Sequence, residues 1–262
     1  MSQRIVCLTT ETVEVLYALG EQDRIVGISG YATRPAIARK EKPKVAAFTT
    51  AKIDKILALE PDLVLGFSNL QADIAAALIK AGIEVHVFNQ RSVDEILQMI
   101  LTLGCLVGAQ EKAGLLINSY QKQINNALEA ASMLPRRPVI YFEEWDEPMI
   151  CSIRWVADLI AIAGGKDCFP ELTTQHAATN RIVSQKQVLA RLPDIIIGSW
   201  CGKKFQPDQV KARAGWQAIP AVKYDFVREI KSADILQPGP SVFTHGLPHL
   251  QAIIAEWQKA QQ

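Results

Sequence analysis

Short apolar runs alternate with helical periodicity along the whole chain. Runs at 5–8, 25–28 and 139–142 have strand length, and apolar residues in the segments between recur every three or four positions. Gly20 and Gly82 close two of these helical segments. A rhythm of strand and helix predicts an α/β fold with parallel sheets.

One pattern occurs twice. Residues 57–68 read Leu-Ala-Leu-Glu-Pro-Asp-Leu-Val-Leu-Gly-Phe-Ser, and residues 189–200 read Leu-Ala-Arg-Leu-Pro-Asp-Ile-Ile-Ile-Gly-Ser-Trp. Because proline disfavours helical geometry at the residue before it, each copy should end a helix there. The apolar run that follows is typical of a strand buried on both faces. The two copies predict two similar halves, with Phe67 or Trp200 just past a strand.

A long helix is predicted between the halves. Apolar residues recur on one side of residues 110–133, which predicts a helix that the prolines at 135 and 138 end. At the usual rise per residue this helix would span roughly 35 Å. We therefore predict two parallel-sheet α/β lobes joined by one long rigid helix. The boundaries are an N-terminal lobe over 1–91, a helical linker over 92–135 and a C-terminal lobe over 136–262.

Composition narrows the class of protein. The chain is 49% apolar and 21% charged with a net charge of +1, which is ordinary for a globular protein and too balanced to favour nucleic acid. No window approaches the roughly 18 uncharged apolar residues of a membrane span. The five cysteines occur singly, which disfavours a disulfide framework.

The first residues of the chain bear on where in the cell the protein is located. Met1 to Arg4 run directly into the first predicted strand, without the apolar core and cleavage site of a signal peptide. We expect a cytoplasmic protein if Met1 is the native start, and a periplasmic one if a signal peptide was removed.

Aromatic residues follow several predicted strands. Tyr31, Phe48, Phe67 and Trp200 all lie just after strands, and ligands bind at the carboxyl edge of open parallel sheets. The pattern favours an aromatic-walled ligand cleft over packing in the core or at a hinge.

Glu143-Glu144-Trp145-Asp146-Glu147 places four acids around a tryptophan after the strand at 139–142. We expect a loop there. Its carboxylates could accept hydrogen bonds from amide or hydroxyl groups on a ligand rim, or coordinate a metal; the alternative is a solvated loop.

Residues 199–205 read Ser-Trp-Cys-Gly-Lys-Lys-Phe. We expect Trp200 and Lys203 to contact a ligand. Two lysines beside Cys201 could instead lower the pKa of its thiol and make it a nucleophile. The chain has no Walker A loop, Gly-x-Gly-x-x-Gly or Gly-x-Ser-x-Gly, so nucleotide binding and α/β-hydrolase chemistry have no support.

Taken together, five segments resemble the class III periplasmic-type substrate-binding proteins, which bind vitamin B12, haem and iron siderophores for ABC importers. The segments are 4–20, 23–29, 56–66, 157–165 and 189–198. The chain looks most like the cobalamin-binding branch, because Tyr31, Phe48 and Phe67 fall where that branch places aromatic residues against the corrin.

The resemblance implies a non-enzymatic protein that holds a small molecule between two lobes and has no cofactor of its own. It also implies a cleft-facing loop over 237–246, in which His245 is a candidate axial ligand to cobalt or iron. Asp73 is the counterpart of an acid that docks onto an ABC permease; the second lobe has only Asp208 nearby. The expected ligand-binding residues are Thr10, Tyr31, Phe48, Phe67, Glu143, Glu144, Trp145, Trp200, Lys203, Pro240 and His245.

Three hypotheses follow. The first is a binding protein for cobalamin or a similar corrinoid. The second is a binding protein for haem or an iron–siderophore complex. The third is a cytoplasmic corrinoid- or metal-processing enzyme without a transport role, which would use Glu143, Glu144, Asp146, Cys201 or His245.

Overall fold

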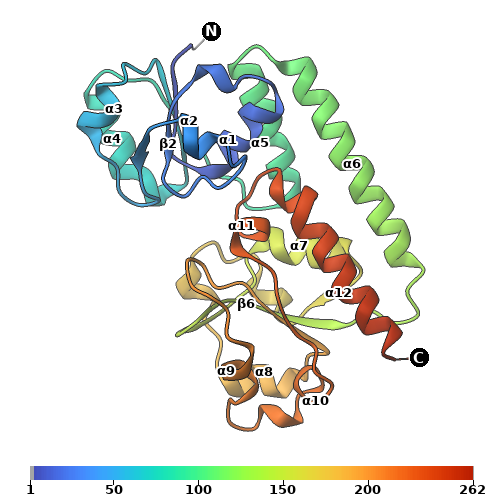
Figure 1. The fold of residues 1–262 in the computed structure, drawn as a ribbon. Helices are drawn as coiled ribbons and strands as arrows, with labels where there is room; N and C mark the ends of the chain where they lie inside the picture. The colour runs from blue at the N-terminus through green and yellow to red at the C-terminus, as the bar shows by residue number, and fades with distance from the viewer. Residues whose placement is uncertain (1–2, 262) are drawn as a thin grey trace. The chain divides into compact units, whose positions relative to one another are not determined.

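The computed structural model describes residues 3–261 and divides them into two compact units (Figure 1). The first comprises 3–90 and 94–120, and the second 91–93 and 121–261. Helix α6 (Gln110–Ser132) begins in the first unit and ends in the second. The two-unit α/β architecture is confirmed, whereas the predicted boundaries at 91 and 135 stay a prediction.

The first unit contains a five-stranded parallel sheet in the order β3-β2-β1-β4-β5. The strands at 5–7, 25–29 and 63–67 coincide with the predicted apolar runs. The bounds of all the strands in this sheet are β1 (Ile5–Cys7), β2 (Ile25–Ser29), β3 (Lys44–Ala46), β4 (Leu63–Phe67) and β5 (Val85–Phe88). The helices are α1 (Thr10–Ala18), α2 (Ala38–Glu41), α3 (Ile53–Leu57), α4 (Ala72–Lys80) and α5 (Val93–Leu106), the last of which starts at the unit boundary.

The strand order of this sheet reverses between β1 and β4. The chain moves outward from β1 through β2 to β3, and then returns to the other side of β1. Since every pair is parallel, all carboxyl ends lie on one edge, and the point of reversal is where parallel sheets of this kind commonly bind ligands.

The second unit contains a sheet in the order β10-β9-β6-β7, with β8 also paired to β6. Only β7 runs antiparallel to its neighbour. The strands are β6 (Val139–Asp146), β7 (Met149–Cys151), β8 (Lys166–Asp167), β9 (Ile195–Gly198) and β10 (Val227–Glu229). The helices are α7 (Arg154–Ile162), α8 (Gln185–Arg191), α9 (Pro207–Lys211), α10 (Pro220–Lys223), α11 (Ser232–Ile235) and α12 (Leu247–Lys259).

Two segments of the second unit differ from expectation. The apolar run at 219–222 reads as a short strand in the sequence but forms most of α10, because Pro220 occupies a first-turn position where its fixed backbone angle suits a helix. The expected loop over 237–246 is helical from Val242 to Gly246, a π-type turn that leads directly into α12. Short 3₁₀ turns lie at Gln22–Arg24, Asn69–Gln71, Pro170–Leu172, Ala178–Arg181 and Trp216–Ala218.

The repeated Pro-Asp pattern has the same structural role in both units. In the first, the carboxylate of Asp62 accepts hydrogen bonds from the backbone N–H groups of Gln3 (2.7 Å) and Arg4 (3.1 Å). In the second, Asp194 accepts from the N–H of Val139 at 2.9 Å. Each aspartate therefore ties the start of its own strand to the start of the neighbouring strand, and we call this pair of contacts the strand latch.

Between residues 3 and 261, no helix combines the length and the apolar content that crossing a membrane requires.

Candidate functional site

Four of the expected ligand-binding residues lie on the carboxyl edge of the first sheet. Thr10, Tyr31, Phe48 and Phe67 follow or end β1, β2, β3 and β4 in turn. The hydroxyl of Thr10 donates to the carbonyl of Tyr31 at 3.2 Å, which fixes the loop that carries that ring. Tyr31 is 59% exposed and Phe48 37%, so both rings are available to a ligand. Phe67 is only 5% exposed and packs beneath this edge.

Gln71 organises the same edge and was missed in the sequence. Its side-chain oxygen accepts from the N–H of Phe67 at 2.8 Å, and its side-chain nitrogen donates to the carbonyl of Phe48 at 2.7 Å. The residue is almost fully buried. An amide can satisfy two loops at once because it both donates and accepts. The only signal in the sequence is a polar residue between the strand and the apolar helix that follows.

Glu11 is an acid buried at this edge, in the first turn of α1. Burial raises the pKa of its carboxyl to about 7, although the N–H of Glu11, the hydroxyl of Thr9 and the N–H of Thr10 act in the opposite direction. Among the described residues its Oε1 atom has no hydrogen-bond partner. This carboxyl can therefore change its protonation near neutral pH.

The acidic run of the second unit is a strand and a turn, and the expectation of a loop is wrong. Strand β6 continues to Asp146 and pairs antiparallel with β7, so Glu147 and Pro148 form the turn of a hairpin. The reason is long-range: Glu143 faces the core and is matched there by an arginine distant in the sequence.

Glu143 is fully buried, and its carboxylate accepts hydrogen bonds from three side chains. The guanidinium of Arg213 contacts both carboxylate oxygens, at 2.6 and 2.9 Å. The Tyr141 hydroxyl donates to Glu143 at 2.9 Å and the Trp200 indole at 3.1 Å. Burial and the charge of Glu143 hold the pKa of Tyr141 well above its usual range. Glu143 is therefore part of the floor of the site, not a carboxylate exposed on its rim.

The next two acids are also paired. Glu144 lies 2.6 Å from the buried Arg181, and Asp146 lies 2.6 Å from the Nζ of Lys203. The Lys203 ammonium stands over the rings of Trp145 (5.3 Å) and Trp200 (4.9 Å). The structure thus brings Trp145, Trp200 and Lys203 together, as the expected ligand-binding set requires.

The described residues include no cluster of three or more His, Cys, Asp or Glu side chains that could hold a metal ion. The carboxylates of Glu143, Glu144 and Asp146 are paired with basic side chains, and metal coordination by the acidic run stays a prediction.

A cavity of about 380 Å³ opens beside the hairpin, entirely within the second unit. Its lining is mostly polar and includes Asp146, Met149, Val183, Trp200, Gln209 and Arg213. The Oδ1 atom of Asp146 is buried and has no hydrogen-bond partner among residues 3–261, so this lining residue keeps one acceptor unsatisfied.

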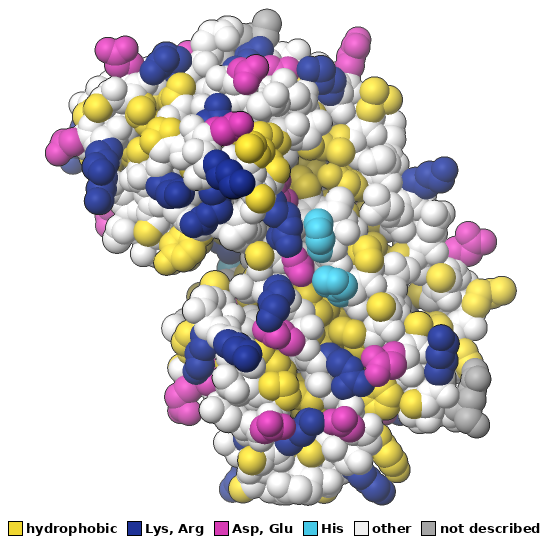
Figure 2. Space-filling view, viewed as in Figure 1, with side chains coloured by type: hydrophobic (Ala, Val, Ile, Leu, Met, Phe, Trp, Pro, Cys, Tyr) yellow, Lys and Arg dark blue, Asp and Glu magenta, His cyan; other side chains and the backbone are white. Residues whose placement is uncertain are grey.

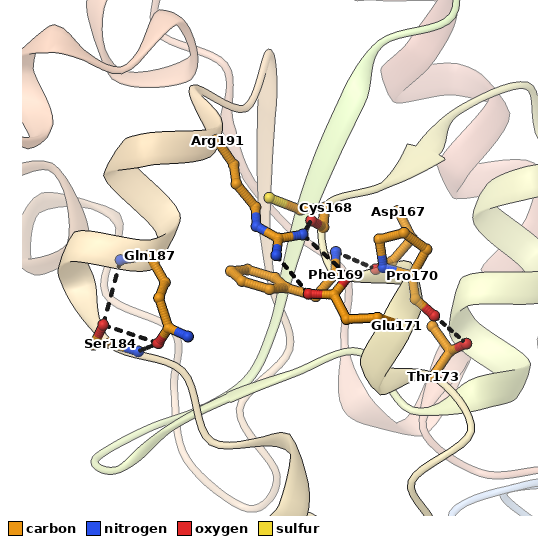
Figure 3. Close-up of polar contacts among 9 residues, drawn as sticks. All are labelled: Asp167, Cys168, Phe169, Pro170, Glu171, Thr173, Ser184, Gln187 and Arg191. Carbon is orange, nitrogen blue, oxygen red and sulfur yellow. Dashed lines mark hydrogen bonds and ion pairs between the residues drawn. The ribbon is translucent and has the colours of Figure 1, made fainter.

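Helix α8 positions one wall of this cavity. Ser184 forms a capping box with Gln187: its hydroxyl accepts from the Gln187 N–H at 3.3 Å, and its own N–H donates to the Gln187 side chain at 2.8 Å. At the other end of α8, Arg191 stacks on Phe169 at 4.1 Å and pairs with Glu171 at 2.5 Å (Figure 3). The helix is therefore fixed at both ends.

Trp200 was expected as an exposed aromatic wall, and the structure corrects this. The ring is 3% exposed and packs edge-on against Phe205, with 4.9 Å between ring centroids. A side chain at Gly198 would come within 1.8 Å of the Phe205 ring, so only glycine fits there. Trp200 contributes an inner surface to the cavity.

The pKa prediction for Cys201 is also wrong. Partial burial and the charge of Glu144 raise the pKa of its thiol, so the neighbouring lysines do not make it a thiolate.

The remaining predicted residues lie apart from the cavity lining. Pro240 is buried, whereas His245 is exposed and its Nδ1 lies 2.8 Å from the Thr244 hydroxyl. Asp73 is exposed in the first turn of α4, and Asp208 is exposed in the first turn of α9. A role for these residues in binding a metal complex or a permease stays a prediction.

Comparison with known proteins shows the family to which this chain belongs. A family model described as periplasmic binding protein matches residues 5–233, most of the chain. The chain belongs to the periplasmic binding protein family. This periplasmic binding protein is therefore a solute-binding protein, and the resemblance found in the sequence is confirmed.

Two curated relatives are similar over most of this periplasmic binding protein. An uncharacterized ABC transporter substrate-binding lipoprotein, YvrC, from Bacillus subtilis (strain 168) is 28% identical over 91% of this chain and 76% of its own length. A vitamin B12-binding protein from Yersinia pestis (strain Pestoides F) is 27% identical over 80% and 74%.

Solved structures share the fold of this periplasmic binding protein. A possible iron-binding, periplasmic solute-binding protein from Staphylococcus epidermidis ATCC 12228 has a TM-score of 0.83 at 22% identity, covering 97% of this chain and 98% of its own. The apo form of a periplasmic haem-binding protein, RhuT, from Roseiflexus sp. RS-1 has a TM-score of 0.82 at 22% identity, with complete coverage of both chains.

Proposed function

We propose that this solute-binding protein holds a corrinoid of the cobalamin type for an ABC-type uptake system. The observation that carries the proposal is the pair of exposed rings, Tyr31 and Phe48, on the carboxyl edge of the first sheet. Their loops are tied down by Thr10 and Gln71, so the rings are ordered before a ligand arrives. Ordered aromatic surfaces suit a large flat ligand, because little conformational freedom is lost on binding.

The charges of the cavity support a corrinoid over haem. The basic residue that lines it, Arg213, is already paired with Glu143, and the lining residue Asp146 is paired with Lys203. Haem carries two carboxylates that call for unpaired cations, whereas a corrin ring is fringed with uncharged amides. Such amides can donate to Asp146 and accept from Gln209. The name of the vitamin B12-binding relative points the same way.

Haem is the second candidate, since a haem-binding protein is among the similar structures. His245 gives this candidate a residue, because an exposed imidazole can coordinate an iron or cobalt centre. An iron–siderophore complex belongs to the same alternative.

We further propose that the protein acts outside the cytoplasm and delivers its ligand to a permease. The B. subtilis relative is named as a lipoprotein, and both similar structures are named as periplasmic, which favours export over the cytoplasmic expectation. Asp73 and Asp208, exposed on α4 and α9, are the acids we propose for docking. The enzyme hypothesis loses support because the thiol of Cys201 has a raised pKa.

The test is a titration of the purified protein with cyanocobalamin, haem and a ferric siderophore, followed by calorimetry and visible spectra. We expect cyanocobalamin to bind with a micromolar or lower dissociation constant. The double variant Tyr31→Ala/Phe48→Ala should weaken this binding by about tenfold or more, because two ring contacts are lost.

Tyr224→Ala is the matched control, since Tyr224 lies in the second unit and is exposed to the same 59% as Tyr31. Binding of haem or the siderophore without any cyanocobalamin signal would overturn the corrinoid proposal.

A further inference from the structure

One segment of the first unit carries a large excess of positive charge. Residues 34–55 contain seven lysines and arginines and two acids, which is a net charge of +5. Because the whole chain has a net charge of +1, the rest of the chain sums to −4. The basic side chains are Arg34, Arg39, Lys40, Lys42, Lys44, Lys52 and Lys55, and we call this segment the basic strip.

The fold keeps the basic strip together. It comprises α2, the edge strand β3 and the start of α3, and α3 packs against β3. The N–H of Lys52 bonds to the carbonyl of Val45, which brings the loop after β3 back alongside the strand. Lys40, Lys44, Lys52 and Lys55 are all exposed. Figure 2 shows Lys and Arg side chains gathered beside apolar ones on the lower part of the first unit.

These lysines differ from several basic residues of the second unit that pair with carboxylates. Examples are Arg191 with Glu171, Lys211 with Asp225 and Arg228 with Glu256. In the part of the chain that the structure describes, Lys40, Lys44, Lys52 and Lys55 have no ion pair. Their charge is therefore available to an external partner.

The extent of the basic strip argues against a small anionic ligand. Lys44 begins β3, at the end of the strand opposite to the edge that carries Tyr31 and Phe48. A strand of this length separates its two ends by about 10 Å. Lys52 follows β3 on the side of the carboxyl edge, whereas Lys44 begins β3 and Lys40 lies in α2. Protection of an edge strand from pairing needs only a single charge, so it does not explain the excess.

An apolar side chain lies among these charges. Ile37 is 44% exposed and directly precedes α2. Exposed apolar side chains among lysines are typical of surfaces that bind lipid bilayers, because the apolar groups enter the interface while the lysines meet anionic headgroups.

We propose that the basic strip is a docking surface for an anionic phospholipid membrane. The strip runs over α2, β3 and the start of α3, and the charges of its exposed lysines at 40, 44, 52 and 55 have the sign that attracts such a membrane. This proposal does not depend on which ligand the protein holds.

The experiment is flotation of the purified protein with vesicles. One set contains phosphatidylcholine alone, and the other contains equal amounts of phosphatidylcholine and phosphatidylglycerol. We expect binding only to the anionic vesicles and its loss at high salt, since salt screens these charges. The triple variant Lys40→Glu/Lys44→Glu/Lys55→Glu should weaken binding on the order of a hundredfold, because each lysine near an anionic surface contributes roughly a factor of five.

The control is Lys186→Glu/Lys223→Glu/Lys259→Glu, three exposed lysines of the second unit. Both triple variants change the net charge from +1 to −5, because each substitution removes two charges. The control should keep its vesicle binding. Equal losses in both variants, or equal binding to neutral vesicles, would overturn the proposal, as would binding of inorganic polyphosphate without any vesicle binding. Cyanocobalamin affinity, measured in parallel, should stay unchanged in both.

Discussion

Glu143 illustrates how a single side chain can be misread when its partner is distant in the sequence. Four acids in five residues indicate a solvated loop, yet the first of them is fully buried. Its partner Arg213 lies 70 residues away and contacts both carboxylate oxygens. No local sequence pattern predicts such a pair, so only the fold shows that this carboxylate stabilises the structure.

Removing Arg213 should therefore be costly. We expect Arg213→Ala to lower the free energy of unfolding by about 3–5 kcal/mol, because it leaves the Glu143 carboxylate buried without its counter-charge. Urea unfolding measures this change. The control is Arg228→Ala, which breaks the more exposed pair with Glu256 and should cost less than about 1 kcal/mol. Similar losses for the two variants would contradict the structural role of Glu143.

At the scale of elements, the first turn of α1 carries a charge that folding disfavours. Thr9 occupies the N-cap position, but its side chain does not cap the helix and its hydroxyl lies 3.3 Å from the Thr12 hydroxyl instead. Glu11 follows in the same turn, buried at the carboxyl edge of the sheet. The element therefore links folding to pH.

The pKa of Glu11, raised from 4.5 to about 7, sets the direction of this link. The folded state binds a proton that the unfolded state releases, so the contribution of Glu11 to stability is fully present below pH 4.5 and is lost as the pH rises through about 7. Between about pH 5 and about pH 8, the wild type should lose roughly 2–3 kcal/mol more unfolding free energy than Glu11→Gln. Urea unfolding of both proteins at both pH values tests this; parallel pH profiles would rule it out.

Most elements could be predicted because their signals are local. The strands of the first sheet are short apolar runs, and glycine or proline punctuates the helices between them. The helix at 220–223 could not be predicted, because its apolar residues resemble a strand until the proline is placed in the first turn of a helix. In the site, exposed Tyr31 and Phe48 follow from their positions after strands. The hydrogen bonds of Gln71 to two separate loops could not be predicted from the sequence, because they depend on how the fold brings the ends of β3 and β4 together.

At the scale of the whole molecule, the two units can be observed separately. All five tryptophans, the first of which is Trp145, belong to the second unit. Tryptophan fluorescence therefore reports on that unit, whereas circular dichroism reports on both. The strand latch occurs once in each unit and can be broken in one at a time.

We expect Asp194→Ala to lower the unfolding free energy reported by fluorescence by about 1–3 kcal/mol, because a partly buried N–H of β6 loses its acceptor. Asp62→Ala should shift the circular dichroism of the first unit and leave the fluorescence transition in place. If both variants moved the fluorescence equally, the two units would unfold as one.

The strand latch lies at the amino ends of the central strands, whereas Tyr31, Phe48 and the cavity residue Trp200 follow their carboxyl ends. The contacts of the strand latch are thus separated from the residues at the ligand-binding edge by the full length of a strand. Evolution can exchange the recognition residues without disturbing the assembly of the sheet. One scaffold can accordingly diversify toward chemically different cargoes, and a designer can retarget it by rewriting only the loops at one edge.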